Sequence, residues 1–219
     1  MKQPISQVYH GDCMDFMRDL PEGYFDILIA DPDFGLNEKI SNGGTWAAKW
    51  NRQDGFLGGK PNRVFFDEVF RISKNQIIWG GNYFDLPECR CFIIWDKVAH
   101  MDTLADCEFA WTSFDKNAKI FSHPRNTTET RMHITQKPVP LYKYLLTNYA
   151  KPGQKIFDPM MGSQSSRIAA WDMGFDYWGC EKDDDYFRDG CARFESHIKK
   201  PVLFAPEQMY NFEQAKLFE

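Results

Sequence analysis

The chain has 219 residues, which is enough for one domain with a sizeable hydrophobic core. Apolar residues make up 43% of the sequence, a globular composition, and 26 basic residues against 31 acidic ones give a net charge of −5. The chain therefore lacks the overall basic charge that is usual for nucleic-acid-binding proteins, and any contact with DNA must come from a local patch.

Neither a secretory signal nor a membrane span is visible in the sequence. The longest apolar run, near residues 25–30, is far too short to cross a bilayer. We therefore expect a cytoplasmic protein, in which the six cysteines are mostly free thiols. Cys89, Cys91 and Cys107, taken with His100, match no standard zinc spacing, so we favour buried thiols over a metal site.

Short apolar runs that end in turn signals alternate with helical patterns, as is typical of an α/β domain. In chain order we expect a strand at 7–10, a helix at 13–19, a strand at 25–30, a helix at 62–73 and strands at 76–79, 92–95 and 109–114. A helix from Pro138, a strand at 155–157, a helix to about 173, a strand at 177–180 and a helix to about 197 follow. The pattern predicts a mixed, mostly parallel sheet with helices on both faces. Polar connections near 92–114 predict an antiparallel edge.

We expect a single domain over residues 1–199, followed by a tail at 200–219. Within the domain, residues 35–63 are rich in Gly, Asn and Trp at their start and show neither helical nor strand periodicity. A long stretch of this kind is typical of a functional loop.

The first candidate site directly follows the predicted strand at 25–30 and reads Asp31-Pro32-Asp33-Phe34. Open parallel sheets bind ligands beyond the carboxyl ends of their strands. A carboxylate, a proline carbonyl and an aromatic ring at such a place could accept hydrogen bonds from an amino group and stack on its ring. The same residues also suit a simple strand-ending turn, because Asp and Pro are common there.

A second candidate site lies at residues 155–163, where a strand, a glycine turn and the start of a helix follow one another. Amide groups at a helix N-terminus attract an anion. Glu181 ends the next predicted strand, where an acidic residue commonly holds ribose hydroxyls. Together the two features favour a ligand with a ribose and an anionic end over an ordinary strand–helix connection.

These segments and three others resemble the amino-methylating DNA methyltransferases of the permuted type, in which the catalytic motif precedes the cofactor motif. Asp31-Pro32-Asp33-Phe34 resembles the catalytic D-P-P-Y/F, and residues 157–165, FDPMMGSQS, resemble the cofactor motif D-P-F-x-G-S-G-T. Residues 133–138, HITQKP, resemble H-x-T-Q-K-P, residues 11–13 match a G-D-C element, and residues 76–82, QIIWGGN, occur in phage-type and orphan members. All five stand in the family's order.

The resemblance implies a Rossmann-like methyltransferase fold and S-adenosylmethionine as cofactor. It also implies methyl transfer to an exocyclic amino group of a base flipped out of double-stranded DNA. Asp31 and the Pro32 carbonyl would accept the amino N–H bonds, and Phe34 would stack on the base. The implied cofactor residues are Asp12, Cys13, Lys137, Asp158, Gly162, Ser163 and Glu181. No metal is implied, because positioning and electrostatics carry the reaction.

Two positions depart from the family's motifs. Asp33 replaces the second proline of the catalytic motif, and a carboxylate beside Asp31 is expected to raise one of the two pKa values. Gln164 replaces a glycine of the cofactor motif, and we expect its side chain to point outward from the first helical turn. A protein that keeps the fold but has lost catalysis, with Asp33 as the lesion, therefore remains an alternative.

Aspartate at the first catalytic position favours adenine N6 as the acceptor, with cytosine N4 as the alternative. Methylation of RNA or of protein amides is less favoured, because the amide enzymes usually carry N-P-P-Y after the cofactor motif. Residues 35–125 are expected to supply the DNA contacts. A local basic set lies within them, although such charges are also common on solvated loops: Lys39, Lys49, Arg52, Lys60 and Arg63.

The last residues of the chain, 214–219, resemble the Q-x-x-L-F peptide that binds bacterial sliding clamps. Leu217 and Phe218 would fill an apolar pocket of the clamp, and Gln214 would fix the register. The alternative is that Leu217 and Phe218 pack onto the enzyme's own core.

Overall fold

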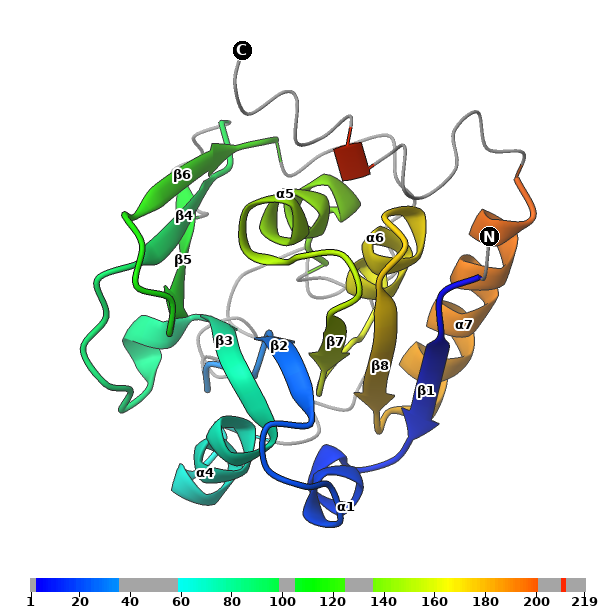
Figure 1. The fold of residues 1–219 in the computed structure, drawn as a ribbon, viewed down its shortest axis with the longest axis horizontal. Helices are drawn as coiled ribbons and strands as arrows, with labels where there is room; N and C mark the ends of the chain where they lie inside the picture. The colour runs from blue at the N-terminus through cyan, green and yellow to red at the C-terminus, as the bar shows by residue number, and fades with distance from the viewer. Residues whose placement is uncertain (1–2, 36–58, 99–104, 125–135, 201–209, 212–219) are drawn as a thin grey trace, which may run out of the picture.

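A computed structural model describes residues 3–35, 59–98, 105–124, 136–200 and 210–211. The strands are β1 (Ser6–His10), β2 (Phe25–Ala30), β3 (Ser73–Trp79), β4 (Phe92–Asp96), β5 (Cys107–Thr112), β6 (Lys119–Ser122), β7 (Lys155–Asp158) and β8 (Asp176–Glu181). The helices are α1 (Cys13–Arg18), α4 (Arg63–Ile72), α5 (Val139–Tyr149), α6 (Ser165–Asp172) and α7 (Asp184–Ile198), with a 3₁₀ turn, η1, at Gly81–Tyr83. Figure 1 shows their arrangement.

The eight strands form one sheet in the order β1-β8-β7-β2-β3-β5-β4-β6. Only β5 runs against its neighbours, because it pairs antiparallel with both β3 and β4, whereas every other pairing is parallel. The carboxyl ends of seven strands therefore lie along the same edge of the sheet. Ligand sites of open α/β sheets form at this edge.

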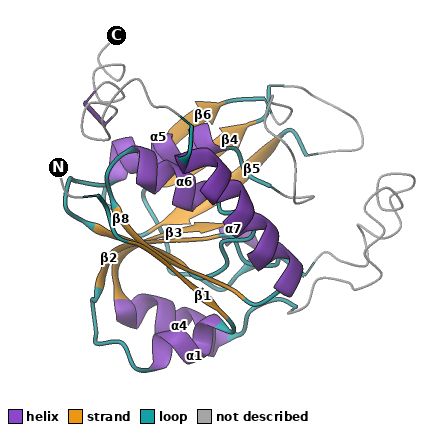
Figure 2. Cartoon of the chain, turned by 90° about the vertical axis from the view of Figure 1, so that its right-hand side faces the viewer, coloured by secondary structure: helices purple, strands orange, loops and turns teal. Residues whose placement is uncertain are grey.

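Helices cover both faces of the sheet (Figure 2). On one face, the buried residues of α1 and α4, such as Met17, Phe65 and Val69, pack against β2 and β7. On the other face, Leu145 of α5 and Ala169 of α6 belong to the second buried cluster. The apolar stripe of each helix is what selects its side of the sheet.

The connections reverse direction next to β2. From β2 the chain continues through α4 to β3 on one side, while β7, on the other side of β2, is reached only after β6 and α5. The ends of β2 and β7 are therefore neighbours although more than a hundred residues separate them in the chain. A crevice at such a reversal is the expected ligand site of the fold.

The predicted fold is confirmed, including the mostly parallel sheet, the helices on both faces and the antiparallel part. The sequence analysis missed β6, and the strand expected at 109–114 lies at Cys107–Thr112. Within the described residues, no helix is long and apolar enough to span a membrane.

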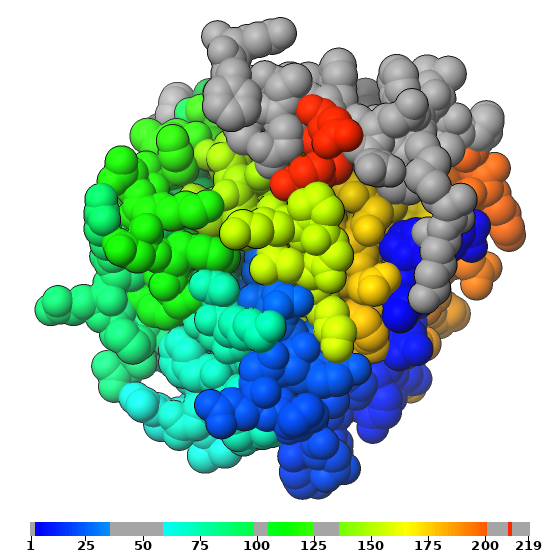
Figure 3. Space-filling model, in the orientation of Figure 1, coloured from blue at the N-terminus to red at the C-terminus, as the bar shows by residue number. Residues whose placement is uncertain are grey.

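Most of the predicted tail, and the greater part of the predicted 35–63 loop, lie outside the described residues. Tyr210 is an exception, since its hydroxyl donates to the carbonyl of Ala150 at 3.1 Å and its ring meets Phe175 edge-on. Residues 210–211, red in Figure 3, lie against the yellow-green residues of α5. The chain after α7 thus returns to the α5 side of the sheet.

Candidate active site

Asp31 follows β2 directly and stands at the carboxyl edge of the central part of the sheet. Its Oδ1 lies 2.5 Å from the ammonium nitrogen of Lys137, which the segment before α5 brings to the same edge. Lys137 is 3% exposed, so this ion pair is largely withdrawn from water. Asp31, the predicted catalytic carboxylate, therefore pairs directly with Lys137, which the family resemblance assigned to the cofactor site.

A second carboxylate and a second ammonium group extend this ion pair. Lys137 Nζ lies 3.1 Å from Glu108 of β5, and Glu108 lies 2.8 Å from the ammonium nitrogen of Lys97, which follows β4. Lys97 is also 3% exposed. The four side chains Asp31, Lys137, Glu108 and Lys97, here called the charge chain, alternate in sign. Such alternation is what makes the burial of two ammonium groups beside two half-buried carboxylates tolerable.

Burial and neighbouring charges act in opposite directions on these groups. Burial raises the pKa of Asp31, and Glu108 adds to this, against the lowering effect of Lys137. Burial opposes the charged form of Lys137, yet Asp31 and Glu108 together raise its pKa above the ordinary value. The pKa of Glu108 falls to about 2 despite its burial, because Lys137 and Lys97 both face it. Lys137 is therefore held as a cation beside Asp31.

The ring of Phe34 lies beside this ion pair and is held by the end of β3. It stacks on Tyr83 of η1 with a centroid distance of 5.1 Å and an interplanar angle of 16°. The ring lies against Gly80, where an added Cβ would come within 2.1 Å of Phe34 Cε1. Gly80 also has a φ of +66°, so the site needs glycine for two separate reasons.

Asp33 forms a local turn, because its Oδ1 accepts a hydrogen bond from the amide of Gly35 at 2.8 Å. The charged groups that shift the pKa of Asp31 are Lys137, Glu108 and Lys97. One of the two neighbouring carboxyl groups, Asp31, does have a raised pKa, but Asp33 is not among the largest causes. Burial of Asp31 itself is the main reason for the rise.

The second predicted site forms where β7 ends. Asp158 closes β7, and its two oxygens accept from the amide of Met160 at 3.0 Å and the hydroxyl of Ser166 at 2.6 Å. Burial raises the pKa of Asp158 to about 7, in spite of these hydrogen bonds, and the negative charges of Asp31 and Glu181 add to the rise. The predicted catalytic and cofactor carboxylates are thus close enough to affect one another.

Glu181, at the end of β8, organises the glycine turn. One of its oxygens accepts from the amide of Gly162 and the other from the amide of Asp183, both at 2.9 Å. Burial raises the pKa of this carboxyl group as well. Ser163 follows the turn and is 8% exposed, with its carbonyl bound by the guanidinium of Arg193 at 2.6 Å.

The Gly11-Asp12-Cys13 segment lies beside Glu181. The amide of Gly11 donates to the Glu181 carbonyl at 2.9 Å, because β1 and β8 are paired neighbours. Asp12 caps α1 by accepting from the amide of Met14 at 2.8 Å. Burial raises the pKa of Cys13 to about 12, so this side chain is a neutral thiol.

Gln164 differs from its prediction. It is fully buried, caps α6 with a φ of +60°, and its amide oxygen accepts from Arg167 at 2.8 Å. Its amide nitrogen reaches the sulfur of Cys191 at 3.3 Å. A left-handed conformation accounts for a glycine at this position of the family motif. In this chain the side chain instead points inward and joins α6 to α7.

Three carboxylates thus end the adjacent strands β2, β7 and β8: Asp31, Asp158 and Glu181. Their pKa values are all raised, and within the described part of the chain the ammonium group of Lys137 contacts Asp31. A ligand that carries positive charge would lower the electrostatic cost of this arrangement. The three carboxylates therefore fit a cationic ligand with hydroxyl groups, because their oxygens can accept hydrogen bonds at the strand ends.

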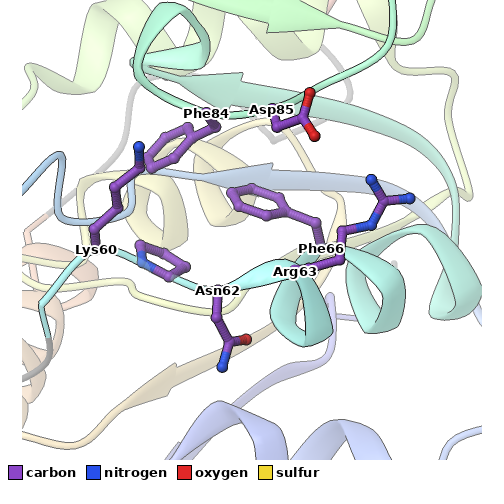
Figure 4. Close-up of a pocket in the computed structure, with 7 residues that line it drawn as sticks. Lys60, Asn62, Arg63, Phe66, Phe84 and Asp85 are labelled. Atoms are coloured by element: carbon purple, nitrogen blue, oxygen red, sulfur yellow. The ribbon is translucent and has the colours of Figure 1, made fainter.

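Of the predicted basic set, Lys60 and Arg63 are within the described residues, whereas Lys39, Lys49 and Arg52 lie outside them. Both described cations line an open cavity of about 330 Å³ together with the rings of Phe66 and Phe84 (Figure 4). Asp85 faces the same cavity. Phe84 meets Phe34 edge-on with centroids 6.3 Å apart, so the cavity adjoins the catalytic segment.

Sequence reasoning missed Glu108 and Lys97. The sequence offered one signal, which was the charged residue Glu108 among the mostly apolar residues of β5. In the structure Glu108 pairs with Trp95 of β4 in the antiparallel part of the sheet. Cys89, Cys91 and Cys107 are free thiols, and the described residues contain no group of three or more His, Cys, Asp and Glu side chains that could hold a metal.

Comparison with known proteins gives a consistent set of matches. The family model N6_N4_Mtase, described as DNA methylase, matches residues 27–191. YubD of Escherichia coli (strain K12), named as a methylase, is 25% identical over 86% of this chain and 90% of its own length.

Two solved structures share the fold. A protein of Thermus thermophilus, named as a DNA modification methylase and complexed with S-adenosyl-L-methionine, has a TM-score of 0.56 at 15% identity, covering 92% of this chain and 99% of its own. The cytosine-N4-specific PvuII DNA methyltransferase has a TM-score of 0.60 at 12% identity, covering 97% and 94%.

Proposed function

The chain belongs to the N6/N4 DNA methylase family, and we propose that it transfers a methyl group from S-adenosylmethionine to adenine N6 in double-stranded DNA. The observation that carries this proposal is the position of Asp31. Its carboxylate stands at the carboxyl end of a central strand, next to the aromatic ring of Phe34 and beside the strand end that carries Asp158. Family membership supports amino methylation of DNA, and the aspartate supports adenine as the base.

The geometry suggests how the chain would activate the acceptor. An adenine inside a duplex cannot present its amino nitrogen to a methyl donor, so the base must be flipped out. The amino lone pair is delocalised into the ring and is a poor nucleophile. Asp31 and the carbonyl of the buried Pro32 would accept the two N–H bonds and favour a geometry in which the nitrogen can attack. Phe34 would stack on the base and fix its plane.

S-adenosylmethionine supplies an electrophilic methyl group on a sulfonium centre, together with an ammonium, a carboxylate and a ribose. The cationic centres suit the edge at which Asp158 and Asp31 stand, since burial raises the pKa values of both carboxyl groups and the charge of Asp31 adds to the rise at Asp158. Glu181 would hold the ribose hydroxyls, and the turn at Gly162 and Ser163 would hold the methionine end.

Three other residues complete the proposed cofactor site. Asp12 and Cys13 would flank the adenine of the cofactor, because the Gly11 amide ties their segment to Glu181. Lys137 would serve both sites, since it contacts Asp31 directly and stands on the segment assigned to the methionine end.

We further propose that the cavity at Lys60 and Arg63 contacts the DNA backbone. The two cations flank aromatic rings next to the catalytic segment, which suits a phosphate and its neighbouring sugar or base (Figure 4). Arg63 is paired with Asp67 at 2.8 Å across an exposed surface, an interaction weak enough to yield to a phosphate.

The domain limits and the tail remain proposals. Residues 1–199 would form one methyltransferase domain, with 35–63 as its DNA-contacting insertion. Residues 200–219 would form a tail whose Gln214, Leu217 and Phe218 bind a bacterial sliding clamp. These three residues lie outside the described part of the chain.

Two substitutions separate chemistry from cofactor binding. Asp31→Ala should lower turnover by orders of magnitude and leave the affinity for S-adenosylmethionine nearly unchanged, because Asp31 would contact the base. Glu181→Ala should weaken cofactor binding instead. Calorimetry gives the affinity, and transfer of labelled methyl groups to DNA gives the turnover. Near wild-type turnover for Asp31→Ala would show that the mechanistic assignment is wrong.

A further inference from the structure

The charge chain reaches beyond the residues that could touch a base or the cofactor. Glu108 belongs to β5 and Lys97 follows β4, so both stand on the antiparallel part of the sheet. Within the charge chain, Lys137 lies between these two residues and Asp31. Its Nζ is 3.1 Å from a carboxylate oxygen of Glu108 and 2.5 Å from Oδ1 of Asp31. The contacts of Glu108 and Lys97 therefore reach Asp31 through Lys137, and their charges also act on the pKa of Asp31 across space.

Apolar side chains would fill this part of the core at a lower cost in free energy than these charged ones. A buried ion pair contributes little net stability, because desolvation offsets most of the attraction. Lys97 and Lys137 are each 3% exposed, and Val98, a β-branched residue, has a φ of +62° directly after Lys97. Strain of this kind persists where the surroundings over-determine the conformation, and it is concentrated at functional sites. Stability alone does not account for these features.

The position of Lys137 is closely defined. Its ammonium nitrogen lies 5.1 Å from the centroid of the Trp79 ring and 5.9 Å from that of Phe34. Two aromatic rings and two carboxylates thus surround it. Removing Glu108 would take away one of the two carboxylates and leave Lys137 free to shift along Asp31.

We propose that Glu108 and Lys97 are positioning residues for methyl transfer: Glu108 holds Lys137 on Oδ1 of Asp31, and Lys97 holds Glu108. This orients the other carboxylate oxygen, Oδ2, towards the amino group of the target base. The inference rests on the proposed function, because it assumes that Asp31 is the acceptor of the amino N–H bond.

Charge supports the same conclusion. The groups that face this region come from five elements: Asp31 after β2, Lys97 after β4, Glu108 on β5, Asp158 on β7 and Tyr142 on α5. The negative charge of Glu108 raises the pKa of Lys137 and also that of Asp31. Its removal should lower both pKa values, so both limbs of the pH–turnover profile should move to lower pH.

The test uses the whole 219-residue chain with Glu108→Gln, Lys97→Met and the double variant. Each single change should lower kcat by about 10-fold to 100-fold, as removal of outer-shell partners does at metal sites. The KM for S-adenosylmethionine should change much less than kcat, because Glu181 and the turn at Gly162, which would hold most of the cofactor, are unchanged. Glu108→Gln should also shift the pH profile towards acid, and Glu108→Asp should recover part of the kcat. Lys119→Met, on exposed β6, is the matched control and should leave kcat unchanged.

The double variant separates positioning from stability. Glu108→Gln alone removes the negative charge that lies 2.8 Å from the Lys97 ammonium group, whereas the double variant restores charge balance and should recover much of the lost unfolding midpoint. Its kcat should stay low, because Lys137 is still not held. Recovery of kcat together with stability would overturn the proposal, as would a single variant that keeps full kcat. An inactive wild-type protein would instead overturn the proposed function.

Discussion

Gly80 offers a direct test of the role of Phe34. The φ of Gly80 is +66°, and a Cβ built there would lie 2.1 Å from Phe34 Cε1 and 2.4 Å from Cδ1. Ordinary contact between carbon atoms requires about 3.5 Å, so Gly80→Ala should displace the ring by roughly 1 Å or more. Misplacement of about 1 Å at a reacting site can cost about 100-fold in rate.

The change in stability separates into two contributions. An alanine in the left-handed region costs about 1–2 kcal/mol, and overpacking adds about 1–3 kcal/mol. Gly153→Ala is the matched control, because Gly153 has a φ of +84° and nothing within 4 Å of the added Cβ. It should show the backbone cost alone and keep full turnover.

The assay combines urea denaturation with steady-state methyl transfer. Gly80→Ala should lose more stability than Gly153→Ala and about 100-fold in kcat, with the affinity for S-adenosylmethionine retained. Adding Phe34→Ala should recover the overpacking part of the lost stability, but not the backbone cost, and should not restore turnover, since the stacking ring is gone. If Gly80→Ala kept turnover within a factor of two of Gly153→Ala, the placement of Phe34 at the reacting base would be refuted.

Three further predictions concern other parts of the chain. Burial raises the pKa of Asp158 to about 7, so the folded chain binds this proton more tightly than the unfolded chain does. This contribution to stability is complete below about pH 4 and is lost as the pH rises through about 7. Asp158→Asn should therefore flatten the fall in the urea midpoint of unfolding between pH 5 and pH 8. An unchanged slope of this midpoint against pH would contradict the raised pKa of Asp158. Asp33→Pro removes the carboxylate that accepts from the Gly35 amide and should be neutral or harmful to turnover; a large gain in the methyl-transfer assay would identify Asp33 as a lesion. Deleting residues 214–219 should abolish pull-down by purified sliding clamp and leave methylation of short oligonucleotides unchanged, whereas loss of folding would favour packing of Leu217 and Phe218 on the core.

The local signals in the sequence were sufficient for most of the fold. Alternation of apolar runs and helical spacing located the central strands, because β2 and β7 are buried on both faces. The sequence analysis did not predict β6, because Lys119–Ser122 is mostly exposed and has no apolar alternation. A short edge strand of this kind depends on its neighbour β4 rather than on its own sequence.

The candidate site was predicted less completely, because its electrostatics are non-local. Asp31 and Glu181 stand out as acids at strand ends, where their position in the chain already indicates a site. Lys97 and Glu108 are brought to Lys137 only by the pairing of β4 with β5 and of β5 with β3. Gln164 was mispredicted for a related reason, since its inward direction depends on Arg167 and on Cys191 of the later helix α7.

The most direct test of the account is methyl transfer to unmethylated double-stranded DNA. The protein is incubated with S-adenosylmethionine that carries a labelled methyl group, and the DNA is digested to nucleosides for mass spectrometry. The account predicts label in N6-methyladenine with the wild-type chain and none with Asp31→Ala. Label recovered only in N4-methylcytosine would contradict the assignment of adenine. Absence of any labelled nucleoside, at cofactor concentrations that calorimetry shows to be saturating, would contradict the proposed activity as a whole.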